Sequence, residues 1–282
     1  VDSLFEAAEQ HQMRLIAGKV MMDRHAPEAL CDSAESAYVD SKALIQKWHG
    51  QGRALYAITP RFAPTSTPEQ LERAGQLKAE FPDVYVHTHL SENKDEIAWV
   101  KDLFPHQNGY LDVYHHYGLT GQRSVFAHCV HLEDTEWKCM HDTNSAIAFC
   151  PTSNLFLGSG LFPLKKTWDQ QVKVGLGTDI GAGTSFSLLQ TVNEAYKVQQ
   201  LQGDKLSAYE SLYHATLGGA KALDLDDKLG NFTVGKEADF VVLDLKATAL
   251  QQLRQSRAKS IEDSLFALFT MGDDRNIEAT YI

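Results

Sequence analysis

The sequence predicts an α/β fold in which strands and helices alternate along the chain. Short apolar runs rich in β-branched and aromatic residues recur between longer amphipathic stretches. Each intervening stretch is long enough to be a crossover helix packed on a parallel sheet. With 43% hydrophobic and 22% charged residues over a length of 282, the composition is that of a globular protein with a large core.

Six strands and five helices are predicted in this order. The strands are the apolar runs at residues 14–22, 54–59, 84–89, 124–128, 146–150 and 174–179. The helices are the amphipathic stretches at residues 34–49, 68–80, 94–103, 134–143 and 187–201. Residues 1–8 have the pattern of a further helix, and they do not begin with Met. We therefore expect the chain to be part of a longer reading frame.

Six alternating strands fit either an open doubly wound sheet or six-eighths of a closed barrel. The positions of polar residues favour the barrel. Five of them stand at or just after the C-terminal ends of different predicted strands: Arg61, His89, His128, Asn154 and Asp179. Barrel active sites are built at that end of the strands. We therefore predict an incomplete (β/α)8 TIM barrel over residues 1–222.

The alternation stops after residue 222, and the last part of the chain has a different pattern. Residues 229–236 are typical of a turn and lead into the apolar run 238–244, which predicts a β-hairpin. Residues 276–282 begin another strand. We expect residues 223–282 to form part of a small β-sandwich, together with a C-terminal helix.

Charge and cysteine content exclude several classes of partner and compartment. The chain has 37 acidic and 26 basic residues and no basic patch, so nucleic acid is not an expected partner. Its four cysteines form no CxxC pair, which is typical of a reducing cytoplasm. No run reaches the roughly 20 apolar residues of a membrane span, and the N-terminus lacks a signal-peptide profile. We expect a cytoplasmic protein that does not bind membranes.

Two histidines, His87 and His89, project from one face of the third predicted strand, because residues two apart on a strand share a face. They could share a metal ion, or they could be satisfied by hydrogen bonds in the core. Glu92 follows just beyond the strand end, where a carboxylate could act as a general acid or base. It could also serve as the acidic residue of a helix N-terminus.

Further metal-ligand residues end two other predicted strands. His128 closes the fourth strand and Asp179 closes the sixth. Each alone could be structural, but buried His and Asp side chains are costly without a metal or polar partners. Together with His89, they form a set of nitrogen and oxygen donors that suits zinc or iron(II) and leaves a position for water.

Four motifs resemble the deaminase branch of the amidohydrolase family. They are the segments 86–93 (VHTHLSEN), 127–129 (AHC), 150–154 (CPTSN) with 158–160 (GSG), and 177–179 (GTD). Residues 230–244 are similar to the segment with which such chains return to a small β-sandwich. Three segments resemble in particular the members that deaminate guanine: 59–62 (TPRF), 91–93 (SEN) and 271–277 (MGDDRNI).

The resemblance implies roles for individual residues. It implies that His89, His128 and Asp179 bind one zinc ion per subunit, with iron as the other compatible metal, and that His87 is a neighbour. Asp179 and Glu92 are the implied catalytic residues.

The implied substrate is a purine. The resemblance assigns Arg61 to the purine carbonyl, Phe62 to the face of the ring, and a further substrate contact to His89. A planar guanidinium suits a carbonyl acceptor, and an aromatic face suits a flat heterocycle. Arg61 could otherwise be an ordinary surface charge.

The chain departs from the family pattern at its start. The family carries a His-x-His pair on its first barrel strand, and no such segment precedes Arg14. The resemblance therefore identifies the six predicted strands as the third to eighth of the barrel and implies two more ligands in a preceding segment.

The activity implied is hydrolysis of guanine to xanthine and ammonia in purine catabolism, by a homodimer. One alternative is a related ring deaminase or chlorohydrolase acting on adenosine-type or triazine rings. Another is a non-catalytic scaffold or an inactive fragment.

Overall fold

The computed structural model describes residues 1–282 and divides into two compact units, residues 1–146 and 147–282. The first unit contains a sheet whose strands run in the order β1-β3-β4-β5, with β2 beside β3. All of these pairs are parallel. The strands are β1 (Leu15–Ala17), β2 (Val20–Met21), β3 (Ala54–Pro60), β4 (Tyr85–Leu90) and β5 (Ser124–His128).

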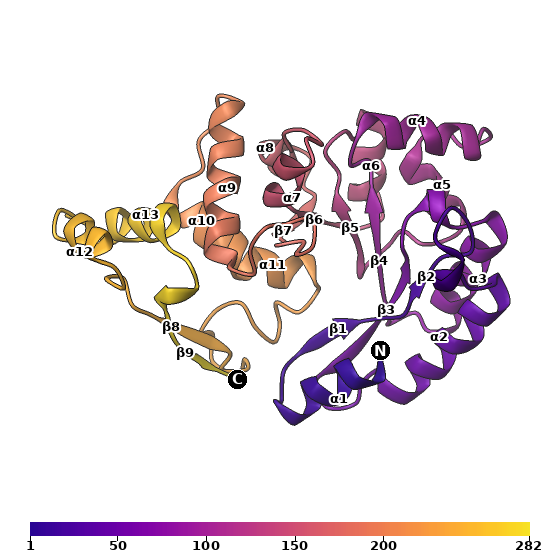
Figure 1. Ribbon diagram of the computed structural model, residues 1–282, viewed down its shortest axis with the longest axis horizontal. Coiled ribbons are helices and arrows are strands. Elements are labelled where there is room, and N and C mark those ends of the chain that lie inside the picture. The colour runs from indigo at the N-terminus through magenta and orange to yellow at the C-terminus, as the bar shows by residue number, and fades with distance from the viewer. The chain divides into compact units, whose positions relative to one another are not determined.

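Helices alternate with these strands, as the sequence predicts. They are α1 (Asp2–Gln10), α2 (Ala34–Trp48), α3 (Pro68–Glu80), α4 (Lys94–Leu103), α5 (Tyr110–His116) and α6 (Asp134–Asp142), with the short 3₁₀ turns η1 (Glu28–Leu30) and η2 (Ala63–Thr65). Helices α2 and α3 pack against each other and against β3 (Figure 1). Their apolar faces and the strands bury a core that includes Tyr56, Ile58, Leu71 and Val86.

The prediction of a single strand at residues 14–22 is wrong. The chain forms two short strands there, β1 and β2, and Gly18 lies between them. A Cβ atom on Gly18 would lie 1.7 Å from the carbonyl oxygen of Ala57, so only glycine permits this close approach to β3. The Lys19 N–H donates to the side-chain hydroxyl of Tyr56 at 3.1 Å instead of to a backbone carbonyl of β3.

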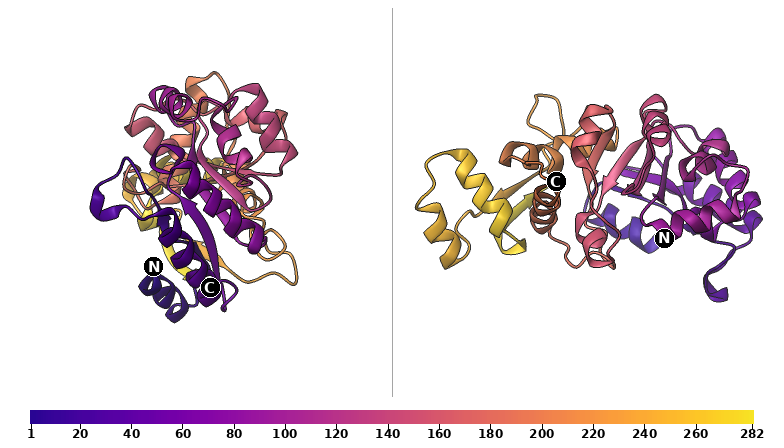
Figure 2. Two further views of the ribbon diagram at one scale, coloured as in Figure 1. Left: turned by 90° about the vertical axis from the view of Figure 1, so that its right-hand side faces the viewer. Right: turned by 90° about the horizontal axis from the view of Figure 1, so that it is seen from above.

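The second unit begins within β6 (Ala146–Phe149), which is the neighbour of β7 (Lys173–Leu176). Its helices are α7 (Pro151–Phe156), α8 (Leu164–Asp169), α9 (Leu188–Leu201), α10 (Ala208–Ala215), α11 (Leu217–Ala222), α12 (Ala249–Gln255) and α13 (Ile261–Met271). Val192, Ala208, Leu268 and Phe269 form a buried cluster where α9, α10 and α13 meet. Figure 2 shows α12 and α13 in yellow, side by side.

Two predictions for this unit need correction. The strand predicted at 174–179 ends at Leu176, so Asp179 lies in the loop beyond it. The predicted hairpin is also wrong, because residues 229–236 form no strand. Instead β8 (Phe240–Leu243) pairs antiparallel with β9 (Ile277–Tyr281), which a turn η3 (Asp274–Asn276) precedes. The last strand and the C-terminal helix, α13, agree with the sequence.

No helix has both the length and the apolar character needed to cross a membrane. The predicted domain boundary at residue 222 stays a prediction.

Candidate active site

Arg61 and Phe62 directly follow β3, and their neighbours fix them to the end of β4. The Arg61 guanidinium carbon lies 5.1 Å from the centroid of the Phe62 ring. The Arg61 carbonyl oxygen lies 2.7 Å from Nδ1 of His89. Because a carbonyl can only accept, Nδ1 of His89 carries the proton, and in the neutral ring Nε2 then holds the lone pair.

His128 ends β5 and lies beside His89. Their rings are stacked with centroids 5.3 Å apart and an interplanar angle of 25°. Nε2 of His128 lies 3.7 Å from Oε2 of Glu92, and the two side chains are 1% and 15% exposed. The structure therefore brings together His89, His128 and Glu92, three residues that the sequence assigns to one site. His87, on the same strand as His89, is exposed.

The backbone after β4 and β5 is strained. Ser91, His128 and Cys129 have φ angles of 48°, 73° and 53°, in the left-handed region that side chains other than glycine rarely adopt. Each such residue costs on the order of 1–3 kcal/mol and persists only where neighbours enforce it. Here the Cys129 N–H donates to the Leu90 carbonyl at 2.9 Å, and the His131 N–H donates to the Ser91 carbonyl at 3.2 Å.

A second carboxylate lies one helical turn from Glu92. Glu96 is buried at the third position of α4, where it forms a capping box with Asn93. Burial is the main cause that raises the pKa of Glu96, and the charge of Glu92 raises it further. Two acidic groups in different environments therefore lie near the start of α4: Glu96 in its first turn, and Glu92 just before the N-cap Asn93 and near His128.

Aromatic residues that the sequence did not single out extend this site. The Phe62 ring meets the edge of Trp99 on α4 with centroids 6.3 Å apart, and it lies 6.1 Å from the His89 ring. Trp99 in turn lies 5.2 Å from His25. Trp99 stands on the outer face of a predicted amphipathic helix, where a single aromatic residue carries no signal of function.

In the second unit, a tight loop holds Asp179. Asp179 has a φ of 47°, and its carbonyl accepts a hydrogen bond from the Gly183 N–H at 2.5 Å. A Cβ atom on Gly183 would lie 1.8 Å from the carbonyl oxygen of Thr178, so the loop requires glycine there. The Gly-rich sequence after Asp179 thus closes a compact turn behind this carboxylate.

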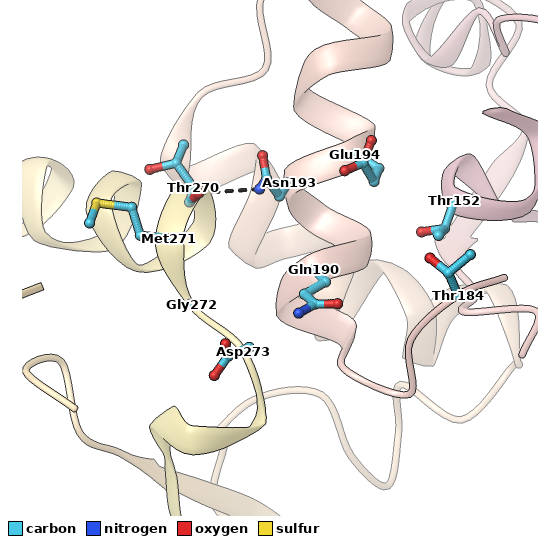
Figure 3. A pocket seen from close by; sticks show the side chains of 9 residues that line it. All are labelled: Thr152, Thr184, Gln190, Asn193, Glu194, Thr270, Met271, Gly272 and Asp273. Carbon is cyan, nitrogen blue, oxygen red and sulfur yellow. Dashed lines mark hydrogen bonds between the residues drawn. The ribbon is translucent and has the colours of Figure 1, made fainter. Parts of the chain in front are cut away.

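A cavity of about 200 Å³ opens beside this loop (Figure 3). Its lining residues are Thr152, Thr184, Gln190, Asn193, Glu194, Thr270, Met271, Gly272 and Asp273. The last three belong to the MGDDRNI segment. Asn276 of that segment is fully buried and donates to the carbonyl of Asp244 at 2.6 Å and to the side chain of Gln251 at 3.1 Å. This segment therefore joins α12 and β8 to the end of α13.

The arrangement of the candidate ligand side chains meets only some of the requirements of a metal centre. No three side chains among His, Cys, Asp and Glu are grouped so that they could hold a metal ion. Two imidazoles are nevertheless paired, and the Nδ1 proton of His89 is directed to a backbone carbonyl, which is how metal-binding histidines are commonly oriented. The donor chemistry of this pair fits zinc. The assignment of His89, His128 and Asp179 as ligands stays a prediction.

The sequence and the fold of this chain are both similar to those of known proteins. The model of the amidohydrolase family matches residues 1–282. Guanine deaminase of Escherichia coli (strain K12) is 67% identical over 282 residues, which are 100% of this chain and 64% of the relative. The solved structure of E. coli guanine deaminase matches with a TM-score of 0.99 and covers 100% of this chain and 66% of that chain.

Two more distant relatives were solved with a bound ligand. Guanine deaminase from C. acetobutylicum, solved with guanine in its active site, is 32% identical with a TM-score of 0.90, over 99% of this chain and 67% of that one. An adenosine deaminase from Xanthomonas campestris, solved with zinc, is 26% identical with a TM-score of 0.85, over 100% of this chain and 62% of that one.

The chain spans 64% of the length of the E. coli relative. The structural matches confirm the predicted fold class, an incomplete (β/α)8 barrel accompanied by a small antiparallel sheet. Since the family model covers every residue, the chain belongs to the amidohydrolase family.

Proposed function

We propose that the protein hydrolyses guanine to xanthine and ammonia with the help of a zinc ion. The observation that carries this proposal is the pairing of His89 and His128, with Glu92 3.7 Å from His128 and Arg61 hydrogen-bonded through its backbone to His89. Its similarity to guanine deaminases, one of which was solved with guanine in its active site, supports this substrate.

Arg61 and Phe62 would bind the purine. The exposed guanidinium of Arg61 can donate to the carbonyl oxygen of guanine, and the half-buried ring of Phe62 can pack on the heterocycle. The Phe62 ring lies 6.1 Å from the His89 ring, and the Arg61 guanidinium lies over the Phe62 ring at 5.1 Å.

His89, His128 and Asp179 would hold the zinc ion, one per subunit, and iron is the alternative metal. When bound, such an ion supplies Lewis acidity that lowers the pKa of water toward neutrality. The adenosine deaminase that resembles this chain was solved with zinc, which supports this choice of metal.

The two carboxylates would move the protons. Asp179 accepts a proton from the attacking water, whose oxygen forms a bond to the amino-bearing carbon of guanine. Glu92 protonates the adjacent ring nitrogen, which lets the ring take up the electron pair. Glu92 then takes the proton of the new hydroxyl group and passes it to the departing nitrogen as the carbon–nitrogen bond breaks. Xanthine and ammonia leave, and the proton held by Asp179 returns to Glu92.

Glu92→Gln tests this mechanism. We expect it to lower kcat for ammonia release from guanine by about 10²–10⁴-fold, because the amide cannot deliver a proton. Asp95→Asn removes a negative charge three residues later, at an exposed position in the first turn of α4, and it should keep near-normal turnover. Undiminished turnover in Glu92→Gln would refute the assigned role.

The same assay with adenine, cytosine and melamine tests the substrate. Guanine should give the highest kcat/KM, because adenine and melamine have no ring carbonyl for Arg61, and cytosine, which has one, lacks the second ring that a purine offers to Phe62. A preference for another ring would contradict the proposed substrate and favour a related deaminase. We propose in addition that the protein is a cytoplasmic homodimer acting in purine catabolism; its four cysteines form no disulfide bond, which fits a reducing compartment.

A further inference from the structure

We propose that Tyr114 is a positioning residue of the purine site: its hydroxyl fixes the backbone that carries Arg61 and Phe62 against the end of β4. The inference rests on the proposed function for its catalytic consequence, and on the hydrogen bonds of the first unit for its geometry. Neither the motifs nor the spacing of the sequence indicates this residue.

The Tyr114 hydroxyl uses both of its hydrogen-bonding roles on these two segments. It accepts from the Ala63 N–H at 2.8 Å and donates to the His89 carbonyl at 2.9 Å. Ala63 directly follows Phe62, and His89 is a proposed zinc ligand. One oxygen atom therefore connects the purine-binding loop to the strand end that carries the imidazole.

A second route joins the same two segments through Thr88. Because the Tyr114 proton goes to His89, the one proton of the Thr88 hydroxyl serves either the Tyr114 hydroxyl at 3.1 Å or the Arg61 carbonyl at 3.2 Å. The Arg61 carbonyl also accepts from Nδ1 of His89. The backbone on both sides of Phe62 is thus held by groups that Tyr114 touches directly or through one side chain.

Tyr114 is itself rigidly placed. It is fully buried on α5, its ring stacks on Tyr110 at 5.7 Å, and it lies 5.6 Å from Phe126 of β5. A packed ring with a single fixed hydroxyl is suited to hold a loop in one geometry.

Removing the hydroxyl should act on substrate binding. In Tyr114→Phe the ring still fills its place, but the Ala63 N–H loses its acceptor, and a buried unsatisfied N–H is costly enough to displace a loop. We expect KM for guanine to rise about tenfold with kcat within about threefold, since the loop that carries Arg61 and Phe62 is the part that moves.

Tyr110→Phe is the matched control. It removes a buried hydroxyl that interacts with Tyr114 and Glu96, one turn earlier on the same helix, and leaves the Tyr114 bonds to Ala63 and His89 in place. Its KM should stay within about twofold of the parent protein. An unchanged KM in Tyr114→Phe, or an equal rise in both variants, would overturn the proposal.

A double-mutant cycle separates positioning from general destabilisation. If Tyr114 acts through Arg61, then Tyr114→Phe should raise KM less than about twofold in an Arg61→Met background, because the contact it positions is already gone. Full additivity of the two changes would count against the proposal, since it would mean that the hydroxyl acts independently of Arg61.

Amide hydrogen exchange gives a readout that does not depend on catalysis. Exchange at Ala63 should become about tenfold faster in Tyr114→Phe and stay unchanged in Tyr110→Phe. If the parent protein released no ammonia from guanine, the proposed function would fail while the exchange result still decided the positioning role. Equal protection of Ala63 in all three proteins would refute that role whatever the activity.

Discussion

At the scale of single residues, strained backbone accompanies the candidate chemistry. Ser91, His128 and Asp179 all have left-handed φ angles, and each lies at or beyond the C-terminal end of a strand. His and Asp adopt this region more often than most residues do, but the conformation still costs free energy. The left-handed backbone sets the directions of the His128 and Asp179 side chains. A regular strand or turn would direct these side chains differently.

Ser91→Gly tests how much of this strain can be relieved. The residue has a φ of 48°, and its hydroxyl is buried without a hydrogen-bond partner. Glycine adopts this conformation freely and carries no polar group. We expect the free energy of unfolding to rise by about 1 kcal/mol, measured by urea denaturation.

Ser91→Ala is the control for this change, because it removes the hydroxyl and keeps the strained backbone. It should recover less stability than glycine does. If the alanine and glycine variants were equally stable, the strain at Ser91 would be negligible.

At the scale of elements, local capping signals define the long helices of the first unit. Ser33, Thr67 and Asn93 each accept a hydrogen bond from the N–H three residues later, at the starts of α2, α3 and α4. These residues explain why the predicted starts agree with the structure. In the second unit, α10 has the same signal, a capping box between Ser207 and Glu210, although it is not among the helices predicted from the sequence.

The short helices could not be predicted in this way. Helices α5, α7, α8 and α11 have six or seven residues and no side-chain cap. Helices of this length are unstable in isolation, so packing against the rest of the fold decides that they form. This is why the helix that carries Tyr114 has no clear pattern in the sequence.

Gly75 tests the packing of α3. A Cβ atom there would lie 2.0 Å from the carbonyl oxygen of Tyr117, just beyond α5. Because that oxygen belongs to the backbone, Gly75→Ala must push the two helices apart, and this should outweigh the better helix propensity of alanine. We expect the free energy of unfolding to fall by about 2 kcal/mol in urea denaturation.

Glu72→Ala, at an exposed position one turn earlier in α3, is the comparison for Gly75→Ala. Its effect should stay within about 0.5 kcal/mol. A Gly75→Ala protein as stable as its parent would show that α3 and the end of α5 can separate at little cost.

At the scale of the whole molecule, the proposed chemistry requires a bound metal. Protein purified without chelator should contain about one zinc ion per chain, and chelation followed by dialysis should abolish ammonia release until zinc is restored. Asp179→Ala should lower zinc content, because it removes a proposed ligand. Less than about a tenth of an equivalent of any metal, with full activity, would contradict the zinc mechanism; the same low content without activity would favour a non-catalytic scaffold.

The sequence by itself determined the alternation of strands and helices, the ends of the longer helices, and the strand-end positions of Arg61, His89 and His128. These features depend on hydrophobic periodicity and on caps, which are properties of neighbouring residues.

Only the tertiary structure decided the break at Gly18, the pairing of β8 with β9, the stacking of His89 on His128, and the link from Tyr114 to Ala63. Each of these joins residues that are far apart in the chain. No local pattern encodes such a contact, because it forms only when folding has closed the intervening loop and buried both partners together.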